Sequence, residues 1–514
     1  MIYLYIQNKN YINQISYVFE TIFLNLGFDY KILDKTQNIN INTEDILISY
    51  LKDNESSYDL PEFKYNIKIK DSNGLFNSNS YMKETVFENI KVQKFDIHNY
   101  GEFISLFSKE DTIYLKRTYE NHSLSYETNF DFISDSFFIL TRMEEVVSAL
   151  EEREDPHNRF SALQSLAYKN DFLDRPIVNE YVEFLWNIID EFKLGYLRKN
   201  WWGNNKFSVC LTHDVDMVFK YTSFKKEIRN SARYLLKEKS PNKFLSNLGL
   251  FVKSKVNYSN DPYWNIKDIM DLEQKKGFTS SFYFMSGGTS KVDNYYKVYD
   301  ERIKNLIRYV EENNFEAGYH ASFNSYNDID LMKEEKEILD KIIREKPYGC
   351  RQHYLRFQAP YTWRLQEAVK LNYDTTLGYA DREGFRAGYC FPYKPYDLLE
   401  NKIIDIWEIP LIVMDVTLAG SNYSNLKPKE GILRVKELMS TVENYGGVFT
   451  ILWHNSSFDE LNPLWRQWAY VYGEILEYIE KKPCSVASGR GIIRNIESVK
   501  KRVYEYEEVI AKTF

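Results

Sequence analysis

The sequence predicts an α/β protein with two domains, a (β/α) barrel of about seven repeats and a separate N-terminal α/β domain before it. At 514 residues the chain is too long for one ordinary domain, and its 44% apolar residues suffice for extensive cores. Strand-like and helix-like segments alternate from residue 206 onward, which is typical of a parallel sheet. The pattern changes at "WWGNNKF" (201–207), so we expect the accessory domain over 1–200 and the barrel over 205–514.

The N-terminal region combines short apolar runs with amphipathic segments. We expect strands at 2–6, 30–33 and 45–51, helices at 12–27 and 176–197, and a strand-like run leading into a helix at 131–152. The region's three histidines are scattered without ligand-like spacing, and no chemistry is predicted for it.

The barrel region repeats the order strand then helix. We expect strands at 206–214, 279–286, 315–323, 354–361, 373–380, 406–418 and 447–454. We expect helices at 268–277, 301–314, 331–346, 364–372, 431–446 and 464–482. Active sites of such barrels lie at the carboxyl ends of the strands, so polar residues that follow strands are the candidates for chemistry.

Composition and net charge indicate the cellular compartment and the partners that can be expected. The net charge of −8 argues against nucleic acid as a partner. Four cysteines without a CxxC pair are typical of a reducing compartment. No signal peptide and no membrane-spanning run is evident, so we expect a cytoplasmic protein. The oligomeric state is not predicted.

Three of the four histidines in the barrel region end or directly follow a strand, and this clustering predicts a metal site. Asp216, His320 and one further donor would hold a divalent ion, Zn²⁺ first, with Co²⁺, Ni²⁺ or Mn²⁺ as alternatives. Asp214, two residues before Asp216, points to the same side of an extended chain and could act as general base. His454 could protonate a leaving amine as general acid.

Two further residues would complete this chemistry. Arg356, if it lies close, would keep Asp214 ionised. A backbone N–H near Tyr361 could stabilise the oxyanion that forms from a substrate carbonyl. Together these parts predict metal-assisted hydrolysis of an amide or an ester.

The order of these motifs resembles the polysaccharide deacetylase family, the NodB-homology carbohydrate esterases. "THDVD" resembles its Asp-Asp motif, "GYHASFN" its histidine motif, "RFQAP" with Tyr361 its Arg…Pro-Tyr motif, and "ILWHNS" its closing Leu-x-His motif. The resemblance covers roughly 205–490 and implies a distorted barrel with Asp214 as base and Asp216 as metal ligand. Residues 1–200 bear a looser likeness to the extra domain of one bacterial subgroup.

The sequence departs from the family's pattern at two places. Asn324 stands where the family usually has a second histidine, so the third ligand is Asn324 or His213. The family's acid that tunes the general-acid histidine has no clean match. Asp374 is the candidate and Asp381 the alternate, and both fit loop acids paired with nearby arginines equally well.

Other residues have both a binding and a structural interpretation. Arg351 and His353 could bind a carboxylate or phosphate of the substrate, or could lie at a solvated strand edge. Trp453 could stack on a sugar ring, or could pack in the core.

A basic segment follows the first barrel strand. Between 220 and 256 the chain has ten Lys or Arg against two Glu, with apolar residues interleaved. The segment suits peripheral contact with an anionic membrane or an anionic, lipid-linked substrate. The alternative is a solvated helical excursion over the barrel mouth.

These observations predict a metal-dependent hydrolase that removes N-acetyl groups from sugars of a bacterial surface polysaccharide, or of its lipid-linked or nucleotide-linked precursor. One alternative keeps the chemistry and changes the acyl group or uses a non-sugar amide. Another is a catalytically silent carbohydrate-binding protein of a polysaccharide assembly system, which Asn324 favours.

Overall fold

The computed structural model describes residues 1–33, 40–52, 60–148, 155–293 and 295–498. The chain forms two compact units, each collected from separate stretches of sequence. The first unit is Met1–Glu154, Leu163–Asn200 and Ala387–Asp405, and the second is Asp155–Ala162, Trp201–Arg386 and Ile406–Phe514. Residues 387–405 thus lie in the first unit and residues 155–162 in the second.

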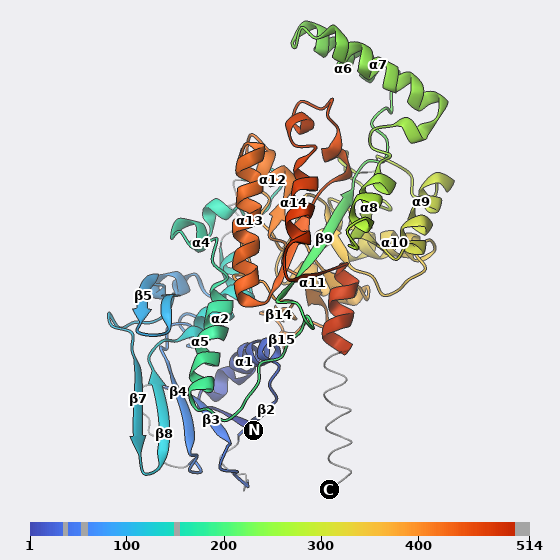
Figure 1. Cartoon of the computed structure of the whole chain (residues 1–514). Coiled ribbons are helices and arrows are strands. Elements are labelled where there is room, and N and C mark those ends of the chain that lie inside the picture. Colours follow the sequence, from blue (N-terminus) through green and yellow to red (C-terminus); the bar gives the residue numbers. More distant parts are fainter. Residues whose placement is uncertain (34–39, 53–59, 149–154, 294, 499–514) are drawn as a thin grey trace, which may run out of the picture. The chain divides into compact units, whose positions relative to one another are not determined.

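The first unit is built on a six-stranded sheet in the order β2-β1-β3-β4-β8-β7, parallel except for the β7–β8 pair (Figure 1). Its strands are β1 (Ile2–Ile6), β2 (Tyr30–Ile32), β3 (Ile46–Lys52), β4 (Tyr65–Asp71), β7 (Leu115–Glu120) and β8 (Ser123–Thr128). Two antiparallel pairs accompany it, β5 (Gln93–Ile97) with β6 (Gly101–Ser105) and β14 (Tyr396–Asp397) with β15 (Lys402–Ile403).

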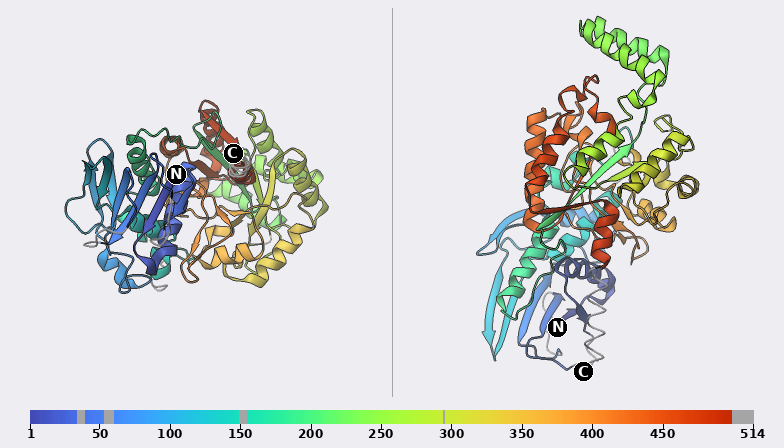
Figure 2. Two further views of the ribbon diagram at one scale, coloured as in Figure 1. Left: turned by 90° about the horizontal axis from the view of Figure 1, so that it is seen from below. Right: turned by 45° about the vertical axis from the view of Figure 1, so that its right-hand side comes forward.

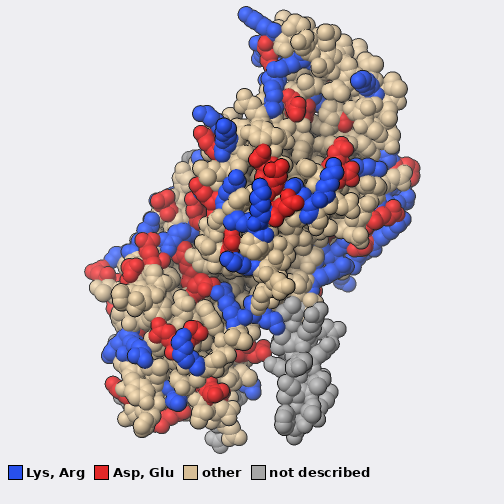
Figure 3. All heavy atoms as spheres, in the orientation of Figure 1, with Lys and Arg blue, Asp and Glu red and all other residues tan. Residues whose placement is uncertain are grey.

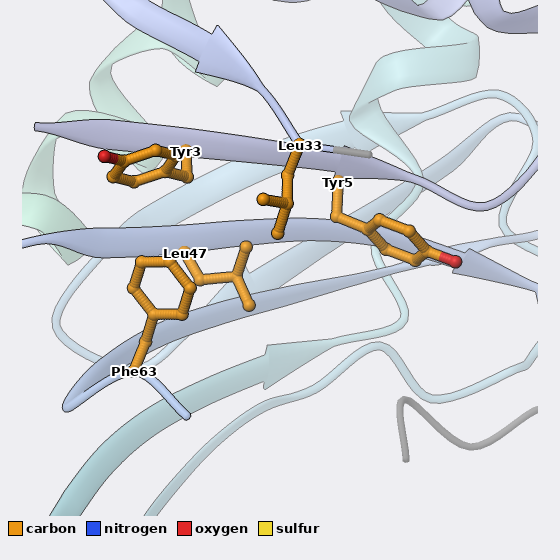
Figure 4. Close-up of a cluster of buried hydrophobic side chains, with 5 residues drawn as sticks. All are labelled: Tyr3, Tyr5, Leu33, Leu47 and Phe63. Atoms are coloured by element: carbon orange, nitrogen blue, oxygen red, sulfur yellow. The ribbon is translucent and has the colours of Figure 1, made fainter. Parts of the chain in front are cut away.

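Strands β1 and β3 of this sheet are apolar and largely buried. Figure 4 shows one buried cluster on β1 and β3, in which the rings of Tyr3 and Phe63 are 5.4 Å apart. The helices of the unit are α1 (Ile12–Leu26), α2 (Phe132–Leu140), α3 (Met143–Val147), α4 (Leu166–Lys169) and α5 (Ile177–Glu191).

The strand-like run expected within 131–152 is helical in the structure. Asp131 accepts a hydrogen bond from the backbone N–H of Ser134 and so caps α2, and burial of both polar and apolar residues of α2 hid its helical period. Residues 149–152 of that expected segment lie outside the described residues.

The second unit holds a parallel sheet in the order β16-β13-β12-β11-β10-β9-β18-β17, with β19 also paired to β9. Its strands are β9 (Phe207–Val215), β10 (Ser281–Phe284), β11 (Glu316–Ala321), β12 (Cys350–Gln352), β13 (Tyr373–Asp374), β16 (Trp407–Glu408), β17 (Val413–Met414), β18 (Val448–Leu452) and β19 (Cys484–Ala487). The parallel α/β architecture expected from the sequence is thereby confirmed in outline. The end strands β16 and β17 are not paired with each other, so the barrel is open.

Helices surround the outer face of this curled sheet, as the view from below in Figure 2 shows. They are α8 (Ile266–Gln274), α9 (Glu301–Glu312), α10 (Ile329–Asp340), α11 (Tyr361–Ala368), α12 (Asp415–Ala419), α13 (Pro428–Tyr445) and α14 (Val471–Glu480). Two further helices, α6 (Phe224–Leu236) and α7 (Pro241–Val256), form a hairpin after β9. None of the described helices has the length and apolar character needed to cross a membrane.

The strand expected at 354–361 lies earlier in the structure. β12 occupies Cys350–Gln352, and the chain then turns because Tyr354 and Leu355 adopt positive φ angles of 62° and 54°. The apolar run that suggested a strand is instead a turn that leads into α11, and it carries His353 out of the sheet.

Tyr373 fills the interior of the barrel, and glycines make room for it. A Cβ atom at Gly349 would lie 2.0 Å from the Tyr373 ring, and one at Gly489 would lie 2.3 Å from it. The Tyr373 hydroxyl donates to Glu316, 2.9 Å away, and lies 2.9 Å from the Tyr283 hydroxyl. The ring therefore cannot move aside without breaking buried hydrogen bonds.

We expect the Gly349→Ala substitution to destabilise the protein by about 1–3 kcal/mol, the usual cost of overpacking a core. The control is Gly473→Ala on α14, where nothing lies within 4 Å of the added Cβ. Alanine there should leave stability unchanged or raise it by about 0.5–1 kcal/mol. Chemical denaturation followed by tryptophan fluorescence measures both, and equal midpoints for the two variants would contradict the packing argument.

Candidate active site

Strand β9 sets the direction of the first site residues, because side chains alternate along an extended chain. Asp214 and Asp216 point to one side and His213 to the other. His213 is fully buried on the helix-covered side, where its ring nitrogens lie 2.6 Å from the Trp453 carbonyl oxygen and 2.8 Å from Glu273. The structure therefore does not bring His213 to the carboxylates as a third ligand.

Three side chains that could hold a metal meet at the carboxyl ends of β9, β11 and β12: Asp216, His320 and His353. Nε2 of His320 lies 3.0 Å from Oδ1 of Asp216, and Nε2 of His353 lies 3.7 Å from the same oxygen. All three donor atoms lie within 4.8 Å of one another. Two imidazole nitrogens and one carboxylate oxygen suit a borderline divalent ion such as Zn²⁺ and leave further positions open.

The other ring nitrogen of each histidine is held by a hydrogen bond that aims Nε2 at Asp216. Nδ1 of His320 lies 3.0 Å from the Arg351 carbonyl oxygen, and Nδ1 of His353 lies 2.9 Å from Oδ1 of Asp293. Such partners fix the tautomer and orientation of metal-binding histidines. No sequence pattern pointed to Asp293, since it lies in a loop well after β10.

Asn324 lies apart from these three residues. Its Nδ2 donates to Thr289 at 2.9 Å, and its Oδ1 accepts from Arg356 at 3.2 Å. Arg356 is occupied there as well, because it donates to the Phe323 carbonyl oxygen at 2.6 Å and stacks over the Phe323 ring. The structure therefore places neither Asn324 as a ligand nor Arg356 beside Asp214.

Arg351 takes the position that the sequence assigned to Arg356. Its Nη1 lies 3.4 Å from Oδ1 of Asp214 and donates to Thr212 at 2.8 Å. Its Nε and Nη2 donate to the backbone and hydroxyl oxygens of Thr375, both at 2.9 Å. This fully buried guanidinium is fixed on three sides, so it orients the Asp214 carboxylate rather than a substrate group.

His454 follows β18 and is held by Asp415, not by Asp374. Nδ1 of His454 lies 2.7 Å from Oδ1 of Asp415, whose Oδ2 accepts from the His454 backbone N–H at 2.8 Å. Burial lowers the pKa of His454, but the Asp415 carboxylate, with smaller contributions from Asp216 and Asp214, outweighs burial and raises it to about 10. Asp374 is buried elsewhere and accepts from Thr376 and Gln366 at 2.6 and 2.9 Å. Asp415 directly follows β17, but it falls inside the strand expected at 406–418 and so did not stand out as a residue at a strand end.

Two expected substrate contacts also lie elsewhere. Trp453 is fully buried and packs on Tyr472, with ring centroids 5.5 Å apart, so it belongs to the core. Tyr361 begins α11 and is exposed, and it does not line the pocket of the site. Asp381, the alternate to Asp374, accepts from Ser161 at 2.6 Å and not from His454.

A pocket of about 350 Å³ contains Asp214, Asp216, His353 and His454. Its wall also contains one arginine, three tyrosines and four apolar side chains: Arg159, Tyr295, Tyr354, Tyr423, Met217, Leu355, Met414 and Val416. Arg159 comes from the short 155–162 segment, and it donates to the Tyr354 carbonyl oxygen and to Asp155, both at 2.9 Å. A larger pocket of about 740 Å³ beside α7 and α8 contains none of the residues above.

Comparisons with known proteins give limited matches. Residues 2–193 match a family of unknown function, DUF7033. None of the curated proteins matches the chain. Among solved structures, the chain is similar to a Mycobacterium smegmatis protein described as a polysaccharide deacetylase, with 14% identity and a TM-score of 0.39 over 58% of this chain and 92% of that one.

Two further solved structures are similar to the chain. Puue allantoinase has 13% identity and a TM-score of 0.38 over 58% of this chain and 92% of that one. Peptidoglycan deacetylase PdaC from Bacillus subtilis has 13% identity and a TM-score of 0.26 over 60% of this chain and 98% of that one.

We expect Asp216→Ala, His320→Ala and His353→Ala each to weaken zinc binding by more than about tenfold, since even residues behind a ligand contribute that much. The matched control is Asn324→Ala, which should bind zinc as the wild type does because Asn324 lies apart from the three donors. Titration calorimetry of the metal-free proteins measures the affinities. Loss of zinc in the Asn324 variant, with retention in the His353 variant, would contradict the assignment.

We also expect Asp415→Asn to lower the pKa of His454 well below 10 in the metal-free protein. The reason is that the carboxylate which raises this pKa most is removed while the burial that lowers it stays. Histidine NMR titration of this seven-histidine chain measures the change. Asp374→Asn is the control, and an equal effect of both substitutions would show that Asp415 does not set the proton affinity of His454.

Proposed function

We propose that the chain is a metal-dependent hydrolase that removes the N-acetyl group from an N-acetylated sugar of a bacterial surface polysaccharide or of its lipid-linked or nucleotide-linked precursor. One observation carries the proposal. A carboxylate that is no metal ligand, Asp214, and a histidine held by its own carboxylate, His454, line the same pocket as two of the three candidate ligands. Hydrolysis of an amide needs this combination of base, acid and electrophile.

The residues divide the reaction between them. A divalent ion at Asp216, His320 and His353 would polarise the scissile carbonyl and acidify the attacking water. Asp214, oriented by Arg351, accepts the proton of that water.

On the leaving group, His454 acts as the acid. Its Nδ1–H donates to Asp415, so its Nε2–H donates to the amine nitrogen. The Asp415 carboxylate raises the pKa of His454 and so favours the protonated imidazole, which the departure of a poor leaving group requires.

The contacts of Asn324 and His353 weaken the case for a catalytically silent binding protein. That interpretation depended on Asn324 as a weak third ligand. His353 supplies a third donor instead, and its second nitrogen is held by Asp293. The tyrosines in the wall, Tyr295, Tyr354 and Tyr423, suit the apolar face of a pyranose ring.

A panel of N-acetylated sugars tests the proposal, with free, oligomeric and nucleotide-linked N-acetylhexosamines and with allantoin as a non-sugar amide. We expect the zinc-loaded wild type to release acetate from at least one sugar, read by mass spectrometry. Asp214→Asn and His454→Ala should each lower kcat by about 10²–10⁴-fold, the usual contribution of a general base or acid.

The control for these two variants is metal content, which should stay at the wild-type level because neither residue is a ligand. Hydrolysis of allantoin without release of acetate from any sugar would replace the sugar substrate with a non-sugar amide. Turnover unchanged in both variants would overturn the assigned roles.

A further inference from the structure

The α6–α7 hairpin (224–256) leaves the second unit at the end where β9 finishes, only a few residues after Asp216. Figures 1 and 2 show it as the outermost element at that end of the second unit. Its contacts with the rest of the unit include a hydrogen bond from the Tyr234 hydroxyl to the Leu461 carbonyl oxygen at 2.7 Å and an ion pair of Glu238 with Arg466 at 3.0 Å. The candidate site opens at the same end of the sheet.

The hairpin buries polar groups between its helices. Ser231 and Asn247 are both 1% exposed and hydrogen-bond to each other at 2.9 Å. The Tyr221 hydroxyl donates to Asn247 at 3.0 Å. Two aromatic side chains of the hairpin are buried as well, since Tyr234 and Phe251 are both 6% exposed. A two-helix hairpin in water normally buries most of its apolar side chains, so those that stay exposed on its outside need an explanation.

The outer surface of the hairpin is apolar. Seven of the 21 exposed large apolar side chains among the described residues lie on α6 or α7: Phe224, Ile228, Leu235, Leu236, Leu245, Val252 and Val256. The three on α7 follow each other at intervals of seven and four residues, which puts them on one face. Their exposed fractions are 62%, 54% and 86%. An apolar surface of this kind marks an interaction site.

The hairpin also concentrates positive charge. Residues 220–256 contain ten Lys or Arg and two Glu, a net charge of +8, whereas the whole chain carries −8. The remainder of the chain is therefore at −16. Several of the basic side chains form no ion pair with any described residue: Lys225, Arg229, Arg233, Lys237, Lys239 and Lys253. Figure 3 shows Lys and Arg, with some Asp or Glu, on a largely tan surface at this end.

We propose that this hairpin docks on an anionic lipid bilayer, with its apolar side chains in the head-group region and its lysines and arginines on the lipid phosphates. Apolar faces bordered by basic residues bind membrane surfaces in this way. The positive charge of the hairpin favours a bilayer over a second copy of the chain as the binding partner. A symmetric dimer through the same surface would bring two +8 segments together, while an anionic bilayer complements both the charge and the apolar face.

The test measures co-sedimentation of the full chain with vesicles of phosphatidylcholine alone and of phosphatidylcholine with phosphatidylglycerol. We expect binding only to the vesicles with phosphatidylglycerol, and loss of binding in high salt. One variant carries Leu235→Ser, Leu236→Ser and Leu245→Ser. A second carries Arg233→Glu, Lys237→Glu and Lys239→Glu. Each should weaken binding by at least about tenfold, because both attractions contribute.

The matched control carries Lys341→Glu, Lys370→Glu and Lys429→Glu, three exposed lysines of the second unit outside the hairpin, and should bind as the wild type does. Circular dichroism and zinc content show that each variant is folded. Equal binding to both vesicle types, or equal loss in the control, would overturn the proposal. So would a wild-type oligomer that the leucine variant converts to a monomer while vesicle binding stays unchanged.

Discussion

The alternation of side chains along a strand that is buried on both faces is the constraint on which the site depends. β9 is buried over all nine residues, so each position must face either the barrel interior or the helices. Asp214 and Asp216 share the interior direction, and His213 between them is forced outward against Glu273. A shift of one residue in the pairing of β9 with β10 would exchange these directions and dismantle the site.

Charge balance within the pocket follows from this geometry. Burial raises the pKa of Asp216, but the neighbouring His353, His320 and His454 outweigh it and hold the pKa well below its usual value. Burial lowers the pKa of His320, and the Asp214 and Asp216 carboxylates outweigh it and raise that pKa. The histidines thus compensate the carboxylates when no cation is bound, and a divalent ion would take over that role in exchange for protons.

Much of the fold and part of the site could be predicted from the sequence. The rest depends on turns and on contacts between residues far apart in the chain, which local sequence patterns do not indicate. Apolar runs and helical spacing located most strands of the barrel, and the strand-end rule located Asp216, His320 and His454. The alternation in "THDVD" already separates His213 from the acids. By contrast, whether Arg351 or Arg356 contacts Asp214 depends on a turn. At this turn Tyr354 and Leu355 adopt positive φ angles, which are uncommon for residues other than glycine.

Contacts across the fold explain the other differences. Asp293 and Asp415 act through histidines that lie 60 and 39 residues away in sequence, and only the folded chain brings them together. His353 has one spacing signal, since it stands two residues after Arg351 and therefore faces the same side. That signal was present in the sequence but indicated substrate binding or a solvated strand edge equally well, and not metal ligation.

The first unit takes its β14–β15 pair from residues 387–405. During synthesis its sheet can form early, but this pair is missing until about four fifths of the 514-residue chain has been made. The second unit has the opposite arrangement. Its segment 155–162 is synthesised first and must wait for the strands from β9 onward before it can pack in its unit. Neither unit corresponds to a continuous stretch of the gene, so neither can be exchanged between proteins as a single cassette, and excision of either by one pair of cuts would leave both incomplete.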